Sequence, residues 1–404
     1  MRRSYRTQAP VAKPSAADLQ LHLEEICRLK ISEVFQAVLE AEVDEALERL
    51  RYERRAVESK AGHRDGHDRP RTIASNRGSI DVQRPRIRGA AFSSVVLPKH
   101  RRRLQNVDAS LTELWLDGLA TRDFEGTLRV FLGAEAPLSA ATIARTNKQL
   151  LANLATWNAR RLDDLELIFT WADGVYLGAG PDDERRVFLV VLGADRTGQK
   201  HLLAIRESMS ESEAGWTDLF ADLAQRGLRA PQLLVADGAC GLWAAADKAW
   251  PKVSQQRCWI HKMRNVEEKL PKKHQRKAHV AMTAIMYAES EAEGRRKLES
   301  LAKSYDRPYP KAAACLRNDR DCLFAYYRFP HATWIHLRTT NPVESIFAPI
   351  RTRTDALKRL RTAEFATAVT LALITKLQPT WRRLRGYRDL IDFPIRPVAL
   401  KRAA

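Results

Sequence analysis

Three acidic residues that are far apart in the sequence have the surroundings expected of ligands in a metal site. Asp173 and Asp237 each follow an apolar, strand-like run and each precede a glycine, whereas Glu344 opens a helix-like segment that carries arginines. Carboxylates brought together at strand ends and a helix start supply the oxygen ligands that Mg²⁺ prefers. Two such ions would activate an attacking water or 3′-hydroxyl and stabilise the leaving oxygen of a phosphodiester. The three acids therefore predict a catalytic site that uses Mg²⁺, with Mn²⁺ as a substitute.

Each acid also has an explanation that involves no catalysis. An Asp-Gly pair often forms a turn after a strand, which would account for Asp173 or Asp237 taken alone. Asn341 can cap a helix whose first residue is Pro342, and Glu344 would then complete a capping box. Two Asp-Gly pairs on neighbouring strands, with a third acid downstream, favour the metal site over these alternatives.

The composition favours a multidomain protein that acts on a polyanion. A length of 404 residues predicts at least two domains, and 45% hydrophobic residues are enough for a sizeable core. The formal net charge of +19 suits contact with the phosphates of nucleic acid, so double-stranded DNA is the expected partner. A basic soluble protein without a nucleic-acid role is the alternative.

Cysteine content and hydropathy predict a soluble, cytoplasmic protein. The five cysteines are scattered and odd in number, unlike the framework of a disulfide-rich secreted domain. Residues 1–15 are basic but lack the apolar stretch of a signal peptide. No run reaches the ~18 apolar residues expected of a membrane-spanning helix, so no membrane association is expected.

The N-terminal part of the chain is expected to be helical at first and then to form short strands. Residues 16–57 have apolar residues at helical spacing. Residues 61–67 are rich in turn-forming types, and short strands are expected at 71–75 and 79–85.

Two basic groups in this part could contact DNA. Arg101, Arg102 and Arg103 belong to a dense basic cluster, which is either a phosphate-binding surface or an ordinary solvated one. Three helical segments follow, and the last carries Arg145 and Lys148. This arrangement is compatible with a helix-turn-helix whose last helix enters a major groove, although three short helices can equally pack together.

The central segment predicts a mixed sheet covered by helices. Three strands, a helix, a strand, a second helix and a fifth strand are expected at 165–177, 186–194, 201–208, 212–226, 232–236, 242–250 and 254–260. The fourth strand is apolar without alternation, as expected of a strand buried on both faces. This order is typical of an α+β, ribonuclease-H-like core, in which Asp173 and Asp237 lie on neighbouring strands.

The remaining residues give the domain organisation, in which an all-helical insertion interrupts the core. We expect an N-terminal helical region, a short β and basic segment, a helix-turn-helix-like DNA-binding region, the first part of the core, the insertion, the final core helices with Glu344, and a basic tail. In the same order, these seven regions span residues 1–60, 61–107, 108–160, 161–262, 263–335, 336–380 and 381–404.

Four further residues are candidates for supporting roles. Cys258 and His261 have the spacing of half a zinc site. Cys240 or a distant histidine could complete such a site, but no second pair has comparable spacing, so zinc is not expected. We instead expect Cys258 to be buried in the fifth strand, and His261 to pack or touch substrate nearby. Trp334 could stack on an unpaired base or pack in the core. Arg351 would share a helical face with Glu344 and could reach a DNA phosphate, or be an ordinary exposed arginine.

Several motifs resemble those of mutator-type transposases, also called the IS256 family. The matching segments begin at Asp173 (Asp-Gly-Val-Tyr-Leu-Gly), Val235 (Val-Ala-Asp-Gly-Ala-Cys-Gly-Leu-Trp), Gln256 (Gln-Arg-Cys-Trp-Ile-His-Lys-Met-Arg-Asn) and Leu337 (Leu-Arg-Thr-Thr-Asn-Pro-Val-Glu-Ser-Ile-Phe). N-terminal runs at Glu42, Arg51 and Gly62 are also similar to that family. The resemblance covers nearly the whole chain in the expected order.

The resemblance implies a DDE transposase with the triad Asp173, Asp237 and Glu344 in a ribonuclease-H-like core. Cys258 and His261 would then be the family's Cys-x2-His signature, and Arg351 a basic position after the glutamate. The N-terminal region would bind the inverted repeats that end an insertion sequence. Hydrolysis there would free a 3′-hydroxyl that attacks target DNA, and a homodimer or larger assembly would hold the two ends.

One departure from the family pattern concerns the segment after Glu344. Pro349 would be poorly tolerated in a continuous helix, so the helix is expected to kink there or to begin at Pro349. The alternatives to a transposase are a structure-specific nuclease with the same core, and a non-catalytic DNA-binding protein derived from a transposase.

Overall fold

The computed structural model describes most of the chain as two compact units, one up to Thr146 and one from Asn147 onwards. The described residues are 16–53, 62–75, 78–104, 107, 110, 113–114, 116, 140–179, 185–251, 253–356 and 362–394. Most of the expected helix-turn-helix region lies outside them. Of the helices in these ranges, none combines the length and apolarity needed to span a bilayer.

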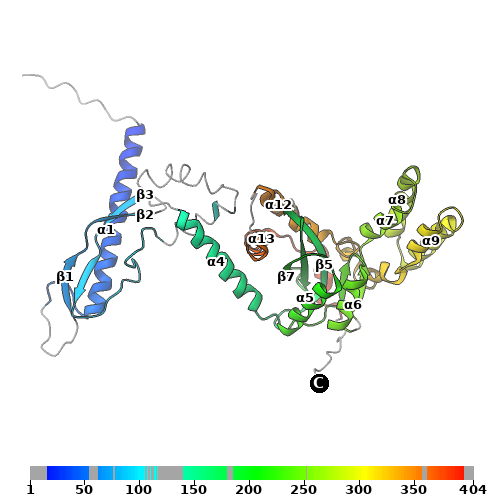
Figure 1. The fold of residues 1–404 in the computed structure, drawn as a ribbon, viewed down its shortest axis with the longest axis horizontal. Coiled ribbons are helices and arrows are strands. Elements are labelled where there is room, and N and C mark those ends of the chain that lie inside the picture. Colours follow the sequence, from blue (N-terminus) through cyan, green and yellow to red (C-terminus); the bar gives the residue numbers. More distant parts are fainter. Residues whose placement is uncertain are drawn as a thin grey trace, which may run out of the picture. The chain divides into compact units, whose positions relative to one another are not determined.

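The N-terminal unit is built on a long helix that packs against a β-hairpin (Figure 1). The helix is α1, Ala16–Leu47, and the antiparallel hairpin strands are β2, Arg71–Ser75, and β3, Gly78–Val82. The buried core between them consists of Leu39, Ile73, Ile80, Val82 and Leu97. The two predicted strands are therefore confirmed, although the second spans Gly78–Val82 instead of residues 79–85.

The end of α1 differs from the prediction of a helix up to residue 57. The helix ends at Leu47, and Glu48 adopts a left-handed conformation with φ of 52°. A non-glycine residue in this region cannot continue a right-handed helix, so the chain turns there. The spacing of apolar residues predicts a longer helix because this spacing carries no information about the backbone conformation of Glu48.

A further strand lies where only a turn was expected. Strand β1, His63–His67, pairs antiparallel with β4, Pro85–Arg88. Arg64 of β1 forms an ion pair with Glu40 of α1 at 2.7 Å and contacts Asp44 as well. Because polar contacts hold this strand, its sequence lacks the alternation of apolar residues by which strands are recognised.

The C-terminal unit contains a five-stranded mixed sheet in the order β7-β6-β5-β8-β9. The strands are β5, Leu167–Ala179; β6, Arg185–Asp195; β7, Lys200–Ser208; β8, Leu233–Ala236; and β9, Ser254–Arg257. The first three are antiparallel neighbours, whereas β8 runs parallel to both β5 and β9. The predicted succession of strands along the chain is confirmed, and so is the predicted pairing of the first strand with the fourth. The last strand ends at Arg257 rather than at residue 260.

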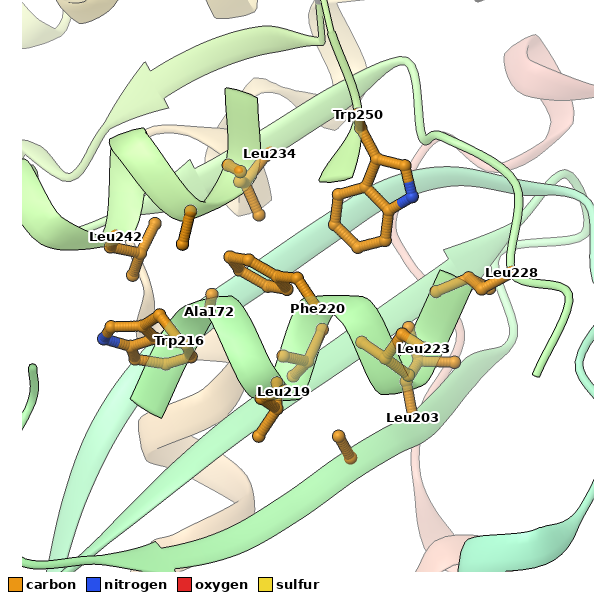
Figure 2. Packing of buried hydrophobic residues seen from close by; sticks show 14 of the residues in the cluster. Ala172, Leu203, Trp216, Leu219, Phe220, Leu223, Leu228, Leu234, Leu242 and Trp250 are labelled. Carbon is orange, nitrogen blue, oxygen red and sulfur yellow. The ribbon is translucent and has the colours of Figure 1, made fainter. Parts of the chain in front are cut away.

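Two helices cover one face of this sheet, and the apolar core lies between them and the strands. They are α5, Glu213–Gln225, and α6, Cys240–Ala249. The predicted stripe of α5 is buried and consists of Trp216, Leu219, Phe220 and Leu223. Figure 2 shows Phe220 packed between Trp216 and Trp250, with ring centroids 5.6 and 5.1 Å away. Full burial of such side chains stabilises the fold by about 1.5–3 kcal/mol each.

The segment between β9 and the Glu344 helix is helical, as predicted. Its α-helices are α7, Trp259–Glu267; α8, Lys272–Met286; α9, Glu291–Tyr305; α10, Pro310–Arg317; and α11, Trp334–Leu337. Short 3₁₀ turns occupy Arg320–Leu323, Ala325–Arg328 and His331–Thr333. Trp171 of β5 donates Nε1–H to the carbonyl oxygen of His336 at 2.9 Å, which ties this segment to the sheet.

The chain then returns to the sheet through two long helices. These are α12, Asn341–Ala356, and α13, Ala363–Leu377, followed by a 3₁₀ turn, Gln378–Thr380, and the short helix α14, Arg388–Ile391. Helix α12 continues through Pro349, so the prediction of a helix that begins at Pro349 is wrong. Glu344 therefore lies in the first turn of a helix.

Candidate active site

The pairing of β5 with β8 brings Asp173 and Asp237 together. The parallel ladder between these strands runs up to the pair Ala172 and Ala236. Asp173 is the next residue within β5, and Asp237 is the first residue after β8. Strand β5 itself continues to Ala179, so Asp173 does not lie at the strand end as predicted. Asp173 instead lies where the hydrogen-bonded ladder between β5 and β8 ends. The two aspartates thus occupy equivalent places on neighbouring strands.

Asp237 also forms the turn that the Asp-Gly alternative predicts. Its Oδ1 accepts the N–H of Ala239 at 2.9 Å, and Gly238 has a φ of +88°. A Cβ on Gly238 would lie 2.6 Å from Cζ of Arg257, so the glycine admits the guanidinium against the turn. This turn occupies one carboxylate oxygen and does not exclude metal binding by the other.

Glu344 does not form the capping box that was the alternative to a catalytic role. The N–H of Asn341, which a capping box would give to Glu344, donates to Oγ1 of Thr339 at 3.3 Å. Glu344 is exposed, and one of its carboxylate oxygens lies within 4.8 Å of ligand atoms of Asp173 and His261. The structure therefore brings Glu344 and Asp173 together.

Cys258 and His261 connect the start of α7 to this cluster. Cys258 is buried directly before α7 and not within β9, which corrects the expectation of a strand position. The backbone N–H and the hydroxyl of Thr340 donate to its Sγ at 3.4 and 3.6 Å. Hydrogen bonding to Cys258, with the charges of Asp173 and Asp237, raises the pKa of His261 to about 9. His261 is therefore a cation beside the carboxylates at neutral pH.

Burial dominates the electrostatics of Asp173. The side chain is only 6% exposed, and burial raises its pKa to about 7, with the charges of Asp237 and Glu211 adding to this effect. His261 and a hydrogen bond from Thr340 act in the opposite direction. A buried carboxylate beside other carboxylates is stabilised as an anion by nearby positive charge and by hydrogen-bond donors.

Glu211 is a functional candidate that the sequence reasoning missed. It lies directly before Ser212, which is the N-cap of α5 and the first residue of the expected helix. Burial raises the pKa of Glu211, and the charge of Asp237 raises it further. Only the folded chain brings Glu211 to these aspartates, so no local pattern in the sequence could have identified it.

The donor atoms of this cluster suit a hard divalent cation. Asp173 and Glu344 offer carboxylate oxygens that lie within 4.8 Å of each other, whereas Asp237 is outside that group and offers its carboxylate from the end of β8. Mg²⁺ and Mn²⁺ accept carboxylate oxygens as ligands together with water and substrate oxygens. A ring nitrogen of His261 also lies within 4.8 Å of these oxygens, and protonation of the ring, which its raised pKa favours, would remove it as a ligand. Sγ of Cys258 accepts hydrogen bonds from Thr340. These residues therefore fit Mg²⁺ better than zinc.

The other predicted site residues lie outside this cluster or serve the core. Trp334 is 8% exposed, donates Nε1–H to the carbonyl oxygen of Phe329 at 2.7 Å, and packs edge-on against Tyr326 and Tyr327. This burial corresponds to the core-packing alternative. Arg351 is exposed on α12.

The basic residues of the N-terminal half differ in their exposure. Arg102 is exposed and Arg101 is half-buried, whereas Arg103 is buried at 5% exposure, beside β2. Lys148 is exposed on helix α4, Ala140–Ala159. Arg145 belongs to the same helix, but its side chain lies outside the described residues.

The whole chain is similar to proteins that move insertion sequences. The family model described as "Transposase, Mutator family" matches residues 6–383. The chain belongs to the Mutator family of transposases. The match to this family extends from the N-terminal unit through all three predicted catalytic acids.

Individual relatives of the Mutator family agree with this assignment. The transposase for insertion sequence element IS6120 from Mycolicibacterium smegmatis is 38% identical over 273 residues, which are 68% of this chain and 84% of that protein. The transposase for ISRM5 from Rhizobium meliloti is 27% identical over 99% of this chain and 100% of its own length. The transposase for IS256 in transposon Tn4001 of Staphylococcus aureus is 25% identical over 92% of this chain and 94% of that protein.

Proposed function

We propose that this Mutator-family protein is a DDE transposase that cleaves and joins DNA at the ends of an insertion sequence in a Mg²⁺-dependent reaction. The observation that carries the proposal is the end of the β5–β8 ladder, which sets Asp173 beside Asp237, together with Glu344 approaching from α12. The sheet order and its helical cover support a ribonuclease-H-like core.

The proposed roles follow from the burial and charge of each side chain. Asp173 and Asp237 would bind metal directly, and Glu344 would complete the site. Bound Mg²⁺ would lower the pKa of the attacking oxygen and offset charge on the scissile phosphate. His261, cationic at neutral pH, is suited to contact a phosphate oxygen of the DNA. Burial of Asp173 excludes water from its carboxylate, which strengthens its interaction with a bound cation.

The proposed partners are the terminal inverted repeats and the target DNA. Exposed Arg102, Lys148 and Arg351 are candidates for phosphate contact, and Arg101 and Arg145 belong to the same basic groups. The buried Arg103 is not suited to this role. We further propose a homodimer or larger assembly on DNA, because joining the element to a target requires both of its ends.

The test is Mg²⁺-dependent nicking of a duplex that carries the inverted repeat from the DNA flanking the gene. Asp173→Asn, Asp237→Asn and Glu344→Gln should each reduce nicking by roughly 10³-fold or more while retaining binding of the duplex. Asp247→Asn is a matched control, because Asp247 lies on α6 and accepts a hydrogen bond from Gln255 at 2.8 Å. It should nick as the wild type does.

Three results would contradict the proposal. Nicking by Asp237→Asn at the wild-type rate would exclude the metal-binding role of the aspartate. Equal cutting of duplexes without the repeat would favour a structure-specific nuclease. Binding of the repeat without any nicking by the wild type would indicate a non-catalytic DNA-binding protein.

A further inference from the structure

Glu211 occupies a position directly over Gly174, the residue that follows Asp173 in β5. A Cβ placed on Gly174 would lie 2.2 Å from Cδ and 2.3 Å from Oε1 of Glu211. Any side chain at residue 174 would therefore occupy the space of this carboxyl group. Glycine inside a strand weakens the strand and often marks the close approach of another group. Here the approaching group is the Glu211 carboxylate.

The edge of the sheet explains how Glu211 reaches the two aspartates. Strand β8 pairs with β5 only as far as Ala172, so β5 is open on that side at Gly174. Asp237 follows β8 at the same level. Glu211 lies against Gly174, the residue next to Asp173. In agreement with this position, the charge of Glu211 helps to raise the pKa of Asp173, and the charge of Asp237 helps to raise that of Glu211.

The contacts of Glu211 leave its charge largely uncompensated. Its side chain forms a hydrogen bond with Tyr176, and His261 contributes a favourable charge from a distance. Within the described ranges, no lysine or arginine forms an ion pair with Glu211. A half-buried carboxylate held beside another carboxylate is costly unless a cation neutralises both.

We propose that Glu211 is a fourth carboxylate ligand, which shares a divalent cation with Asp237. This inference rests on the proposed metal-dependent function and adds to it a residue beyond the three predicted acids. Asp173 and Glu344, which lie together with His261, would face the other side of the site. Gly174 would serve to admit the carboxylate of Glu211 to the metal.

The test measures binding of Mn²⁺ to the full-length protein by electron paramagnetic resonance, independently of activity. Glu211→Gln should weaken binding of one Mn²⁺ ion roughly tenfold or more, because it removes a charged oxygen ligand. Glu213→Gln is the matched control, since Glu213 lies two residues further on and forms an exposed ion pair with Lys248 at 2.7 Å. It should bind Mn²⁺ as the wild type does.

Two further variants separate a ligand role from a merely structural one. Gly174→Ala keeps every carboxylate group, but its Cβ would displace the carboxylate of Glu211. This variant should therefore weaken binding of the same Mn²⁺ ion. If both residues bind one ion, the double variant with Glu211→Gln and Asp237→Asn should bind Mn²⁺ only slightly more weakly than Asp237→Asn alone. Circular dichroism would verify that each variant is folded.

The outcomes distinguish this inference from the proposed function. If the wild type binds Mn²⁺ and nicks DNA but Glu211→Gln binds Mn²⁺ with unchanged affinity, the ligand role of Glu211 is wrong and the proposed function stands. Additive losses in Glu211→Gln and Asp237→Asn would contradict a shared ion. If the wild type neither binds Mn²⁺ nor nicks the repeat, both the inference and the proposed function fail.

Discussion

At the scale of single residues, the site contains two side chains, Asp173 and His261, whose pKa values are raised above their usual ranges. Asp173 has a pKa of about 7 because it is buried, and His261 has a pKa of about 9 because of Cys258 and the aspartates. The cationic imidazole partly offsets the carboxylates before any metal is bound. Such opposed shifts in neighbouring groups are typical of functional sites.

A histidine outside the site gives a prediction about acid stability. Burial lowers the pKa of His336 to about 4, and the charges of Lys200 and Arg385 contribute. Its Nε2 accepts the backbone N–H of Arg385 at 2.8 Å, a bond that requires the neutral ring. Between pH 6.5 and 4 the unfolded chain therefore binds more protons at this residue than the folded chain.

His336 should consequently destabilise the fold as the pH falls through this window. His336→Gln, which keeps a hydrogen-bond acceptor and cannot be protonated, should show a smaller fall in melting temperature between pH 7 and pH 5 than the wild type. Thermal unfolding followed by circular dichroism measures this. An identical fall in both proteins would contradict the assigned state of His336.

At the scale of secondary structure, the turn after β8 decides where Asp237 points. Gly238 adopts a φ of +88° and lies against Arg257, which ends the neighbouring strand β9 and contacts Asp319. Gly238→Ala should destabilise the fold by about 1–2 kcal/mol from backbone strain alone. It should also lower nicking sharply, since the Cβ would collide with the guanidinium and shift the turn.

Gly227 provides a control for strain without displacement of the site. It has a φ of +93° in the same unit, and a Cβ there would meet the exposed side chains of Arg161 and Asp163. Gly227→Ala should lose a comparable amount of stability in urea unfolding but retain nicking. Equal nicking by both alanine variants would show that the Gly238 turn does not position Asp237.

The sequence predicts an element correctly where the buried residues of that element recur at regular spacing. The stripe from Trp216 to Leu223 and the apolar run of β8 were predicted correctly because burial repeats at helix and strand spacing. Strand β1 was missed because ion pairs of Arg64 hold it. The capping box, which was the alternative to a catalytic Glu344, is wrong because Oγ1 of Thr339 accepts the backbone N–H of Asn341.

The residues of the candidate site were likewise predicted only where a local sequence pattern marked them. Asp173 and Asp237 each carried a local signal, a glycine after an apolar run, and the sheet order made them neighbours. Glu211 carried none, because its relation to Gly174 exists only once β7 has returned along the sheet and the loop before α5 has formed. Residues that meet through long-range packing require the folded structure to be recognised.

At the scale of the whole molecule, a basic chain carries an acidic candidate site. The net charge of +19 favours binding along DNA, whereas the carboxylates beside β5 and β8 repel phosphate unless cations are bound. Divalent metal would therefore be needed for the chemical step more than for binding of the terminal repeat.

Strand joining tests this account most directly. A terminal-repeat duplex with a pre-cleaved 3′-hydroxyl would be incubated with target plasmid, the full-length protein and either Mg²⁺ or EDTA. The account predicts that the wild type joins the end to the plasmid only with Mg²⁺, and that Asp237→Asn binds the duplex without joining it. Joined product in EDTA, or equal joining by Asp237→Asn, would contradict it.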